Sequence, residues 1–383
     1  MDAGLPQPAT TTSASLARIS TTPPNRSKSP MNLLRLLLHV KRSRQRIRFV
    51  APLPFALIVG CVTVPPPPVV APPAPVVQRE RGPELGRDDD FAIVTVQSGE
   101  DIAVLAERYL GDRSKGWWIA EFNGAETVHP GQVIVVPLRP RNAFGVHAGG
   151  YQTVPILTYH RFGSKRNKLT VTPTAFEAQM DYLAKNGYQV ISLARLVPFL
   201  EGKQPLPRKS VVITIDDGYR STYEIAYPIL ARHGFAATVF LYSDFVGAPD
   251  ALTWVQMKEM NGSGLIEIQP HSKTHANLTL RLPGESDVKY RERMAREIEA
   301  PISLIRDRLD AASITYAYPY GDVNETIVDQ LSRRGIPLAA TVTAGGNGFF
   351  AHPHMLRRSM IFGDEDLAMF ESKLATFTRT RMR

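Results

Sequence analysis

Two carboxylates stand side by side at the end of an apolar run. The stretch "VVITIDDG" at 211–218 passes from apolar and β-branched residues directly into Asp216, Asp217 and Gly218. Asp and Gly are common turn formers, so the pair could simply close a strand. Open α/β sheets and α/β barrels, however, carry their reactive groups beyond the carboxyl ends of strands. In that position the two carboxylates could bind a metal ion or move a proton.

Two histidines follow another β-rich run. His271 and His275 come after "LIEIQ" at 265–269, and at this spacing their imidazoles would share one face of a helical turn and could bind one metal ion. Ser272 stands where the helical metalloprotease motif has its Glu, so that class is excluded. Because both motifs follow β-rich runs, we expect them at the same end of a barrel. One carboxylate and two neutral imidazoles would form a metal site that brings the pKa of a bound water toward about 7.

The elements that must position these residues alternate between strand and helix from about residue 153 onward. A helix is expected over 173–187, with Pro173 near its start, Phe176, Met180 and Leu183 on one face, and Gly187 as its stop. Further helices are expected over 223–233 and 288–309. The expected strands are 154–157, 189–192, 211–215, 236–241, 265–269, 314–318 and 338–343. This alternation predicts an α/β fold, best explained as a (β/α) barrel that is short by a strand.

Three ordered motifs extend this prediction to a family. "TIDDGY", "HSKTH" and "YAYPYG" (316–321) occur in the order and approximate spacing of the polysaccharide deacetylases, the NodB homology domain of carbohydrate esterase family four. The resemblance covers about 154–370. With Tyr159 and His160 forming "YH", it is closest to the branch that includes the poly-N-acetylglucosamine deacetylases. It implies a distorted, seven-stranded (β/α) barrel that hydrolyses N-acetyl groups of N-acetylglucosamine-containing polysaccharides and releases acetate.

The same resemblance implies a role for each motif residue. Asp217, His271 and His275 would bind a divalent metal, zinc by expectation, with cobalt, nickel and iron as alternatives. Asp216 would be the general base, and the backbone N–H of Tyr320 would face the oxyanion.

Two features depart from the usual family pattern. Ala317 stands where an Arg often precedes the proline of the third motif, so the usual Arg contact to the base is not assured. The usual late histidine motif for the general acid is also missing. We therefore expect His160 to be the general acid, with His354 second and His352 third; each could instead be a surface histidine.

A smaller unit over 91–138 has the expected order strand, helix, helix, strand, and it resembles a LysM domain. The matching residues are "VQSGED" (96–101), "AERYLGD" (106–112), Asn123 and "PGQVIVVP" (130–137). The resemblance implies binding to N-acetylglucosamine-containing glycans. Trp117 and Trp118 could stack on sugars or fill the small core, and Trp254 could line the sugar site or begin a helix as a core residue. The candidate sugar-binding residues are Tyr159, Trp254, Trp117 and Asn123.

The N-terminus has the features of an export signal. The basic block at 41–48 precedes an apolar stretch too short to span a bilayer, and "IVGC" at 58–61 resembles a bacterial lipobox in which Cys61 is acylated. An uncleaved anchor is the alternative, and Met31 could be the start instead of Met1. We expect a leader over 1–61, a proline-rich linker over 62–90, a LysM domain over 91–140 and a catalytic domain over 150–383. Val62 resembles lipoproteins of the Gram-negative outer membrane facing the periplasm, with a Gram-positive cell surface as the alternative.

Charge argues against a nucleic-acid partner. The net charge is +9, but residues 1–61 hold nine of the 45 basic residues and one of the 36 acidic ones, which leaves 36 basic and 35 acidic residues in 62–383. Residues 62–383 are nearly neutral, so they lack the excess of basic residues expected of a nucleic-acid-binding protein. The expected partners are an acetylated glycan, either peptidoglycan or an exopolysaccharide, and a membrane reached through the lipid anchor. An O-acetyl polysaccharide esterase and a catalytically silent glycan-binding lipoprotein remain as alternatives.

Overall fold

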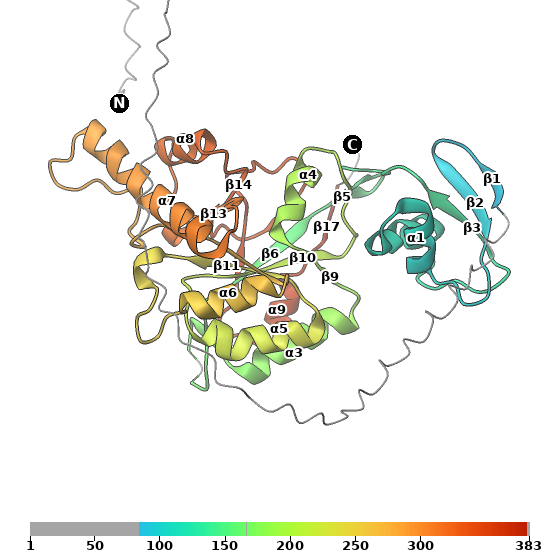
Figure 1. The fold of residues 1–383 in the computed structure, drawn as a ribbon, viewed down its shortest axis with the longest axis horizontal. Helices are drawn as coiled ribbons and strands as arrows, with labels where there is room; N and C mark the ends of the chain where they lie inside the picture. The colour runs from blue at the N-terminus through green and yellow to red at the C-terminus, as the bar shows by residue number, and fades with distance from the viewer. Residues whose placement is uncertain (1–83, 166, 381–383) are drawn as a thin grey trace, which may run out of the picture. The chain divides into compact units, whose positions relative to one another are not determined.

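The computed structural model describes residues 84–165 and 167–380 (Figure 1). Cys61, the basic block and nearly all of the proline-rich linker lie outside the described residues. Within the described ranges, none of the helices combines the length and apolar character needed to cross a membrane. The segment 84–138 and the larger segment that follows are described separately.

The segment 84–138 has the predicted strand–helix–helix–strand order, with one additional strand at its start. Its elements are β1 (Glu84–Arg87), β2 (Phe91–Thr95), α1 (Ile102–Leu110), η1 (Arg113–Lys115), α2 (Gly116–Asn123) and β3 (Val133–Pro137). β2 lies between β1 and β3 and pairs antiparallel with both. Asp101 caps α1 by accepting a hydrogen bond from Val104 N, and Gly111 ends the helix in a left-handed conformation. Both helices pack on a small core that includes Val94, Leu105 and Ile134.

A parallel sheet forms the body of the larger segment. Its strands β6 (Val154–Tyr159), β10 (Ser210–Ile215), β11 (Ala237–Leu241) and β12 (Ile266–Pro270) lie in the order β12-β11-β10-β6, with every neighbouring pair parallel. β16 (Ser359–Met360) continues this parallel order beside β6. Every residue of β6 and β10 is buried, because helices and loops cover both faces of such a sheet.

The barrel is closed imperfectly. β13 (Thr315–Ala317) and β14 (Leu338–Ala340) form a parallel pair, and an isolated bridge from Ala340 to Leu356 connects β14 toward β16. β12 and β13 are in contact but share no ladder. Instead, the side chain of Gln269 accepts hydrogen bonds from Ile314 N and Thr315 N at 2.9 and 3.1 Å. The predicted distorted α/β barrel is confirmed. The distortion lies between β12 and β13, where hydrogen bonds to the Gln269 side chain replace a strand ladder.

Helices surround the strands in the predicted alternation. They are α3 (Pro173–Lys185), α4 (Leu196–Leu200), α5 (Tyr227–His233), α6 (Trp254–Gly262), α7 (Asp287–Leu309), α8 (Glu325–Arg333) and α9 (Leu367–Ser372). In Figure 1, α3 lies beside α5 and α9, while α7 lies beside α6 and α8. Thr172 caps α3, and Phe176, Met180 and Leu183 form its buried face as predicted.

Shorter elements complete the larger segment. They are β4 (Val146–His147), β5 (Gly150–Gln152), β7 (Arg161–Phe162), β8 (Thr170–Val171), β9 (Gln189–Val190), η2 (Leu193–Arg195), a π-helical turn η3 (Thr222–Ala226), η4 (Ser243–Phe245), η5 (Pro319–Gly321), β15 (Gly346–Asn347) and β17 (Phe377–Arg379). η4 and η5 matter most for function, because they follow β11 and β13 at the end of the barrel where the predicted reactive residues lie.

Candidate metal centre

The residues of the three motifs, and His160, follow barrel strands. Asp216 and Asp217 come directly after β10, His271 after β12, His160 after β6, and Tyr320 shortly after β13. Because these strands run parallel, their carboxyl ends meet at one end of the barrel. The structure therefore brings together residues that are up to 160 positions apart in the sequence.

Asp217, His271 and His275 form a possible metal-binding group whose ligand atoms all lie within 4.8 Å of one another. Asp217 Oδ1 is 3.3 Å from His275 Nε2 and 3.8 Å from His271 Nε2. This oxygen is buried, and among the described residues it has no hydrogen-bond donor. A buried carboxylate oxygen without a donor, facing two imidazole nitrogens, fits a divalent cation and is costly without one.

The electrostatics keep these groups in the forms that bind metal. Burial acts to raise the pKa of Asp217, but the neighbouring His275 and His271 imidazoles lower that pKa below its ordinary value. Burial lowers the pKa of His271, which favours the neutral ring. The Nδ1 of His271 lies 2.8 Å from the carbonyl oxygen of Ala317, so a hydrogen bond there leaves Nε2 free as a ligand.

The loop that carries the two histidines is not helical, so the predicted helical turn is wrong. Ser272 and His275 have φ of 73° and 59°, and this left-handed backbone folds the loop until the ring centroids are 4.9 Å apart. Asp217 and Tyr320 also have positive φ, at 75° and 62°. Such residues each cost about 1–3 kcal/mol and persist where the surroundings enforce them, commonly at functional sites.

Two glycines allow this backbone. Gly218 has φ of 80°, and a Cβ there would lie 2.7 Å from Leu241 Cδ1; Gly321 has φ of 78°, and a Cβ there would lie 2.6 Å from Val342 N. Backbone conformation therefore favours the final Gly of both "DDG" and "AYPYG", and at Gly321 the nearby backbone also leaves no space for a side chain.

A residue that the sequence analysis missed holds Asp216. Arg358 is completely buried, and its Nη1 and Nη2 donate to Asp216 Oδ1 and Oδ2 at 2.7 and 2.9 Å. Its Nε donates to the carbonyl oxygen of Thr341 at 2.8 Å, which fixes the guanidinium plane. Burial acts to raise the pKa of Asp216, but the Arg358 guanidinium and, to a lesser extent, the His271 and His160 imidazoles together outweigh it and lower this pKa to about 2. The Arg contact missing at Ala317 is thus supplied from the residue before β16.

His160 and Tyr320 flank this group. His160 is half-buried and lies close enough to interact electrostatically with both Asp216 and Asp217. The Tyr320 side chain is 60% exposed, and its ring centroid is 4.9 Å from that of His275. Within the described part of the chain, the backbone N–H of Tyr320 has no protein acceptor. It is therefore available to a bound group.

The other two histidines proposed as general acids lie elsewhere. The ring of His354 is buried, and its Nε2 lies 2.8 Å from the carbonyl oxygen of Ile336, just before the amino end of β14. His352 is exposed, and its Nδ1 accepts a hydrogen bond from His354 N. The amino end of a barrel strand is opposite the carboxyl end where the metal ligands lie. The prediction of His354 as a catalytic residue is therefore wrong.

Two predicted sugar-binding residues of the barrel have structural roles. Tyr159 is fully buried; its hydroxyl donates to Gln179 Oε1 at 2.9 Å, and its ring packs on Phe162 and Phe176. Its side chain cannot contact a polymer. Trp254 begins α6 and packs, partly buried, against the main core, which matches its alternative role as a core aromatic at a helix start.

In the smaller segment, Asn123 is also structural. Its Nδ2 donates to the carbonyl oxygens of Ile119 and Val135 at 2.8 and 2.7 Å, and its Oδ1 accepts from Val135 N at 3.0 Å. These bonds join α2 to β3 and use both ends of the amide, so Asn123 has a structural role in this segment. Trp117 and Trp118 are both half-buried, with their rings edge to face.

Comparisons with known proteins agree with this site. Residues 203–339 match the family model for polysaccharide deacetylase. The chain is 32% identical over 192 residues to YxkH of Bacillus subtilis (strain 168), which carries a provisional polysaccharide deacetylase name; the match covers 50% of this chain and 65% of YxkH. It is 26% identical over 211 residues to the poly-beta-1,6-N-acetyl-D-glucosamine N-deacetylase of Escherichia coli (strain K12), covering 46% of this chain and 31% of that protein.

A solved structure shares the fold. The deacetylase PplD of Streptococcus pyogenes, determined in complex with acetate, matches with a TM-score of 0.53 at 24% identity, covering 58% of this chain and 98% of that one. The chain spans less than two thirds of the length of the two curated relatives. Residues 203–339, which include Asp216, Asp217, His271 and His275, are thus the part of the chain that is similar to the polysaccharide deacetylase family.

Proposed function

We propose that this protein is a metal-dependent hydrolase that removes N-acetyl groups from an N-acetylglucosamine-containing polysaccharide and releases acetate. The observation that carries the proposal is the placement of an ionised carboxylate, Asp216, next to the ligand set Asp217, His271 and His275. Amide hydrolysis needs an activated water, stabilisation of an oxyanion, and a proton for the departing amine.

Each of these needs has a residue at the site. A divalent metal, zinc by expectation, held by Asp217, His271 and His275 would supply Lewis-acid chemistry and lower the pKa of water toward about 7. Asp216 takes the proton of the attacking water, and Arg358 holds its carboxylate in one orientation. The Tyr320 N–H donates to the developing oxyanion. His160, on the neighbouring strand end, donates a proton to the leaving amine.

The chemistry of the rim favours a sugar polymer. Tyr242 lies beside His275 with ring centroids 5.2 Å apart, and it stacks on Phe245 at 5.0 Å with an interplanar angle of 11°. Phe245 in turn contacts Tyr219, whose ring faces the Arg161 guanidinium. Half-exposed aromatic rings with nearby polar groups suit the alternating apolar and hydroxylated faces of pyranoses. The E. coli relative named above, and others from Staphylococcus aureus, are named for action on poly-beta-1,6-N-acetyl-D-glucosamine.

The test is acetate release by the whole protein from a panel of polymers. Poly-N-acetylglucosamine, chitin oligomers and peptidoglycan present N-acetyl groups, and acetylated xylan presents O-acetyl esters. The proposal expects chelator-sensitive release from an N-acetylated polymer. Release from the ester alone would replace it with an O-acetyl esterase, and no release from any polymer would favour a silent glycan binder.

We also propose that the rest of the chain serves to place this site on its polymer. The strand–helix–helix–strand order over 91–138 and the motifs it carries support a LysM glycan-binding domain. Binding the same polymer at two points raises its effective concentration at the catalytic site. Acylation of Cys61, which the sequence at 58–61 supports, would attach the protein to a membrane, in our proposal the outer membrane of a Gram-negative cell. Labelling with a radioactive fatty acid, lost in Cys61→Ala, tests the anchor.

A further inference from the structure

The loop that carries His271 and His275 lies between β12 and α7 and is itself neither strand nor helix. Its carbonyl groups are fixed from one side, because Ser272 O and Lys273 O accept hydrogen bonds from Ser243 N and Asp244 N of η4 at 3.2 and 2.9 Å. Within the loop, Ser272 Oγ accepts a hydrogen bond from His275 N at 2.9 Å. These bonds satisfy carbonyl groups and the N–H of His275, so the N–H groups of Lys273 and Thr274 need acceptors from elsewhere.

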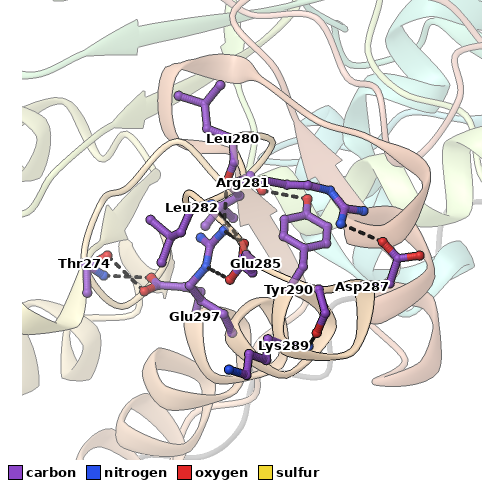
Figure 2. Close-up of polar contacts among 12 residues, drawn as sticks. Thr274, Leu280, Arg281, Leu282, Glu285, Asp287, Lys289, Tyr290 and Glu297 are labelled. Atoms are coloured by element: carbon purple, nitrogen blue, oxygen red, sulfur yellow. Dashed lines mark hydrogen bonds and ion pairs between the residues drawn. The ribbon is translucent and has the colours of Figure 1, made fainter.

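That support comes from one glutamate on α7 (Figure 2). Glu297 Oε2 accepts hydrogen bonds from Lys273 N and Thr274 N at 3.1 and 3.0 Å, and Oε1 accepts one from the Thr274 hydroxyl at 2.9 Å. Glu297 is only 7% exposed. A carboxylate buried this deeply is retained only where its hydrogen bonds compensate for lost hydration. Here all three bonds go to the two residues at the centre of the histidine loop.

The helix that carries Glu297 is itself tied to the chain that leaves the loop. The Tyr290 hydroxyl donates to Leu278 O at 2.8 Å, and Arg293 forms two bonds of 2.7 Å with the carboxylate of Glu285. Figure 2 shows Tyr290 and Glu297 on α7, with dashed lines joining Glu297 to Thr274. These contacts join α7 to the segment that follows the loop, whereas the hydrogen bonds of Glu297 reach the loop itself.

We propose that Glu297 is a positioning residue for the metal centre: its three hydrogen bonds set the conformation of residues 271–275 and thereby the separation of the His271 and His275 ligand atoms. The inference rests on the proposed metal site but not on the identity of the substrate. Residues that orient metal ligands typically change metal affinity by about 10- to 100-fold when they are removed.

Two substitutions separate the geometry of Glu297 from its charge. In Glu297→Gln, the amide oxygen can still accept from both N–H groups, and the amide NH₂ can donate to the Thr274 hydroxyl oxygen. In Glu297→Ala, all three bonds are lost. We therefore expect Zn²⁺ affinity, measured by competition with a chromophoric chelator, to fall about 10- to 100-fold in the Ala variant and to recover to within a few-fold in the Gln variant.

A matched control lies in the same network. Glu285 also has an enclosed carboxylate, with its side chain 6% exposed, but it contacts Arg293 and Leu282 N and, in the described contacts, no residue of the histidine loop. Glu285→Ala should lower thermal stability while leaving Zn²⁺ affinity unchanged. Thr274→Val, which removes one of the three bonds, gives a milder second variant if Glu297→Ala does not fold.

The outcomes are distinct. Weakened Zn²⁺ binding in Glu297→Ala and Thr274→Val, but not in Glu285→Ala, supports the proposal even if no polymer is deacetylated. Wild-type Zn²⁺ affinity in folded Glu297→Ala overturns it. Equal loss of affinity in Glu285→Ala and Glu297→Ala also overturns it, because the effect would then come from general loosening of α7.

Discussion

Replacement of Arg358 by Met should damage both the fold and the reaction. The substitution preserves much of the side-chain length and removes both hydrogen bonds to the Asp216 carboxylate, which is 2% exposed. Removing one partner of a buried ion pair typically costs about 3–5 kcal/mol, because the other charge stays buried and unpaired.

The Arg358–Asp216 interaction also acts on the pKa of Asp216. Folding lowers this pKa from 3.8 to about 2, with burial opposing the shift and Arg358 driving it. A lowered pKa stabilises the fold above pH 3.8, and this contribution is lost as the pH falls toward 2. A shift of this size corresponds to about 2 kcal/mol of stability at neutral pH. Arg358→Met removes the lowering effect of the guanidinium and keeps the raising effect of burial. The pKa of Asp216 should therefore rise, and the acid limb of the activity profile should move to higher pH.

The assay combines denaturant unfolding with kcat/KM as a function of pH. We expect a loss of about 3–5 kcal/mol in unfolding free energy and a loss of about 100-fold in kcat/KM at neutral pH, since a misplaced catalytic group commonly has that effect. Arg357→Met is the matched control, because Arg357 is exposed and its guanidinium contacts only Ala344 O among the described residues. Wild-type kcat/KM and an unchanged acid limb in Arg358→Met would refute the role assigned to Arg358.

Four further predictions concern other parts of the molecule. Removal of divalent metal by a chelator should abolish acetate release, and added Zn²⁺ should restore it; activity that survives complete metal removal would contradict the metal site. His160→Gln should lower kcat by about 10²- to 10⁴-fold with unchanged metal content, because it removes the proton donor; unchanged kcat would place the general acid elsewhere. Tyr242→Ala should raise KM about fivefold, since a ring contact is worth ~1 kcal/mol, and a KM equal to wild type would remove Tyr242 from the sugar site. Asn123→Ala should destabilise the segment 84–138 by about 1–3 kcal/mol through the unsatisfied Val135 groups; loss of glycan binding at unchanged stability would restore Asn123 as a sugar ligand.

Much of the catalytic end of the barrel could be predicted because parallel strands align their carboxyl ends. Each of the three motifs follows a β-rich run, so placing the runs in one sheet already places Asp217 near His271. The strands themselves were readable from their β-branched and apolar residues. Local patterns could not give the left-handed backbone at Ser272 and His275. Non-glycine residues adopt it uncommonly, even though His is enriched there, and the surrounding contacts enforce it.

Arg358 and Glu297 escaped prediction for a related reason. Arg358 pairs with a residue 142 positions away and stands just before β16, a strand of two residues that is too short to show periodicity. Glu297 lies within a helix rich in charged side chains, where a glutamate is normally solvent-exposed. Tyr159 shows the opposite error. Its motif predicted a place in the sugar site, but it lies in a fully buried strand and belongs to the core. Local sequence patterns do not show which single polar side chains are buried.

The division of labour between the two adjacent carboxylates is the central claim, and paired measurement of metal content and acetate release in two variants tests it most directly. Asp216→Asn should retain bound Zn²⁺ and lose acetate release, because it removes the base and leaves the ligand set intact. Asp217→Asn should lose both, because it removes a ligand. Full activity in Asp216→Asn, or normal Zn²⁺ content in Asp217→Asn, would contradict the account.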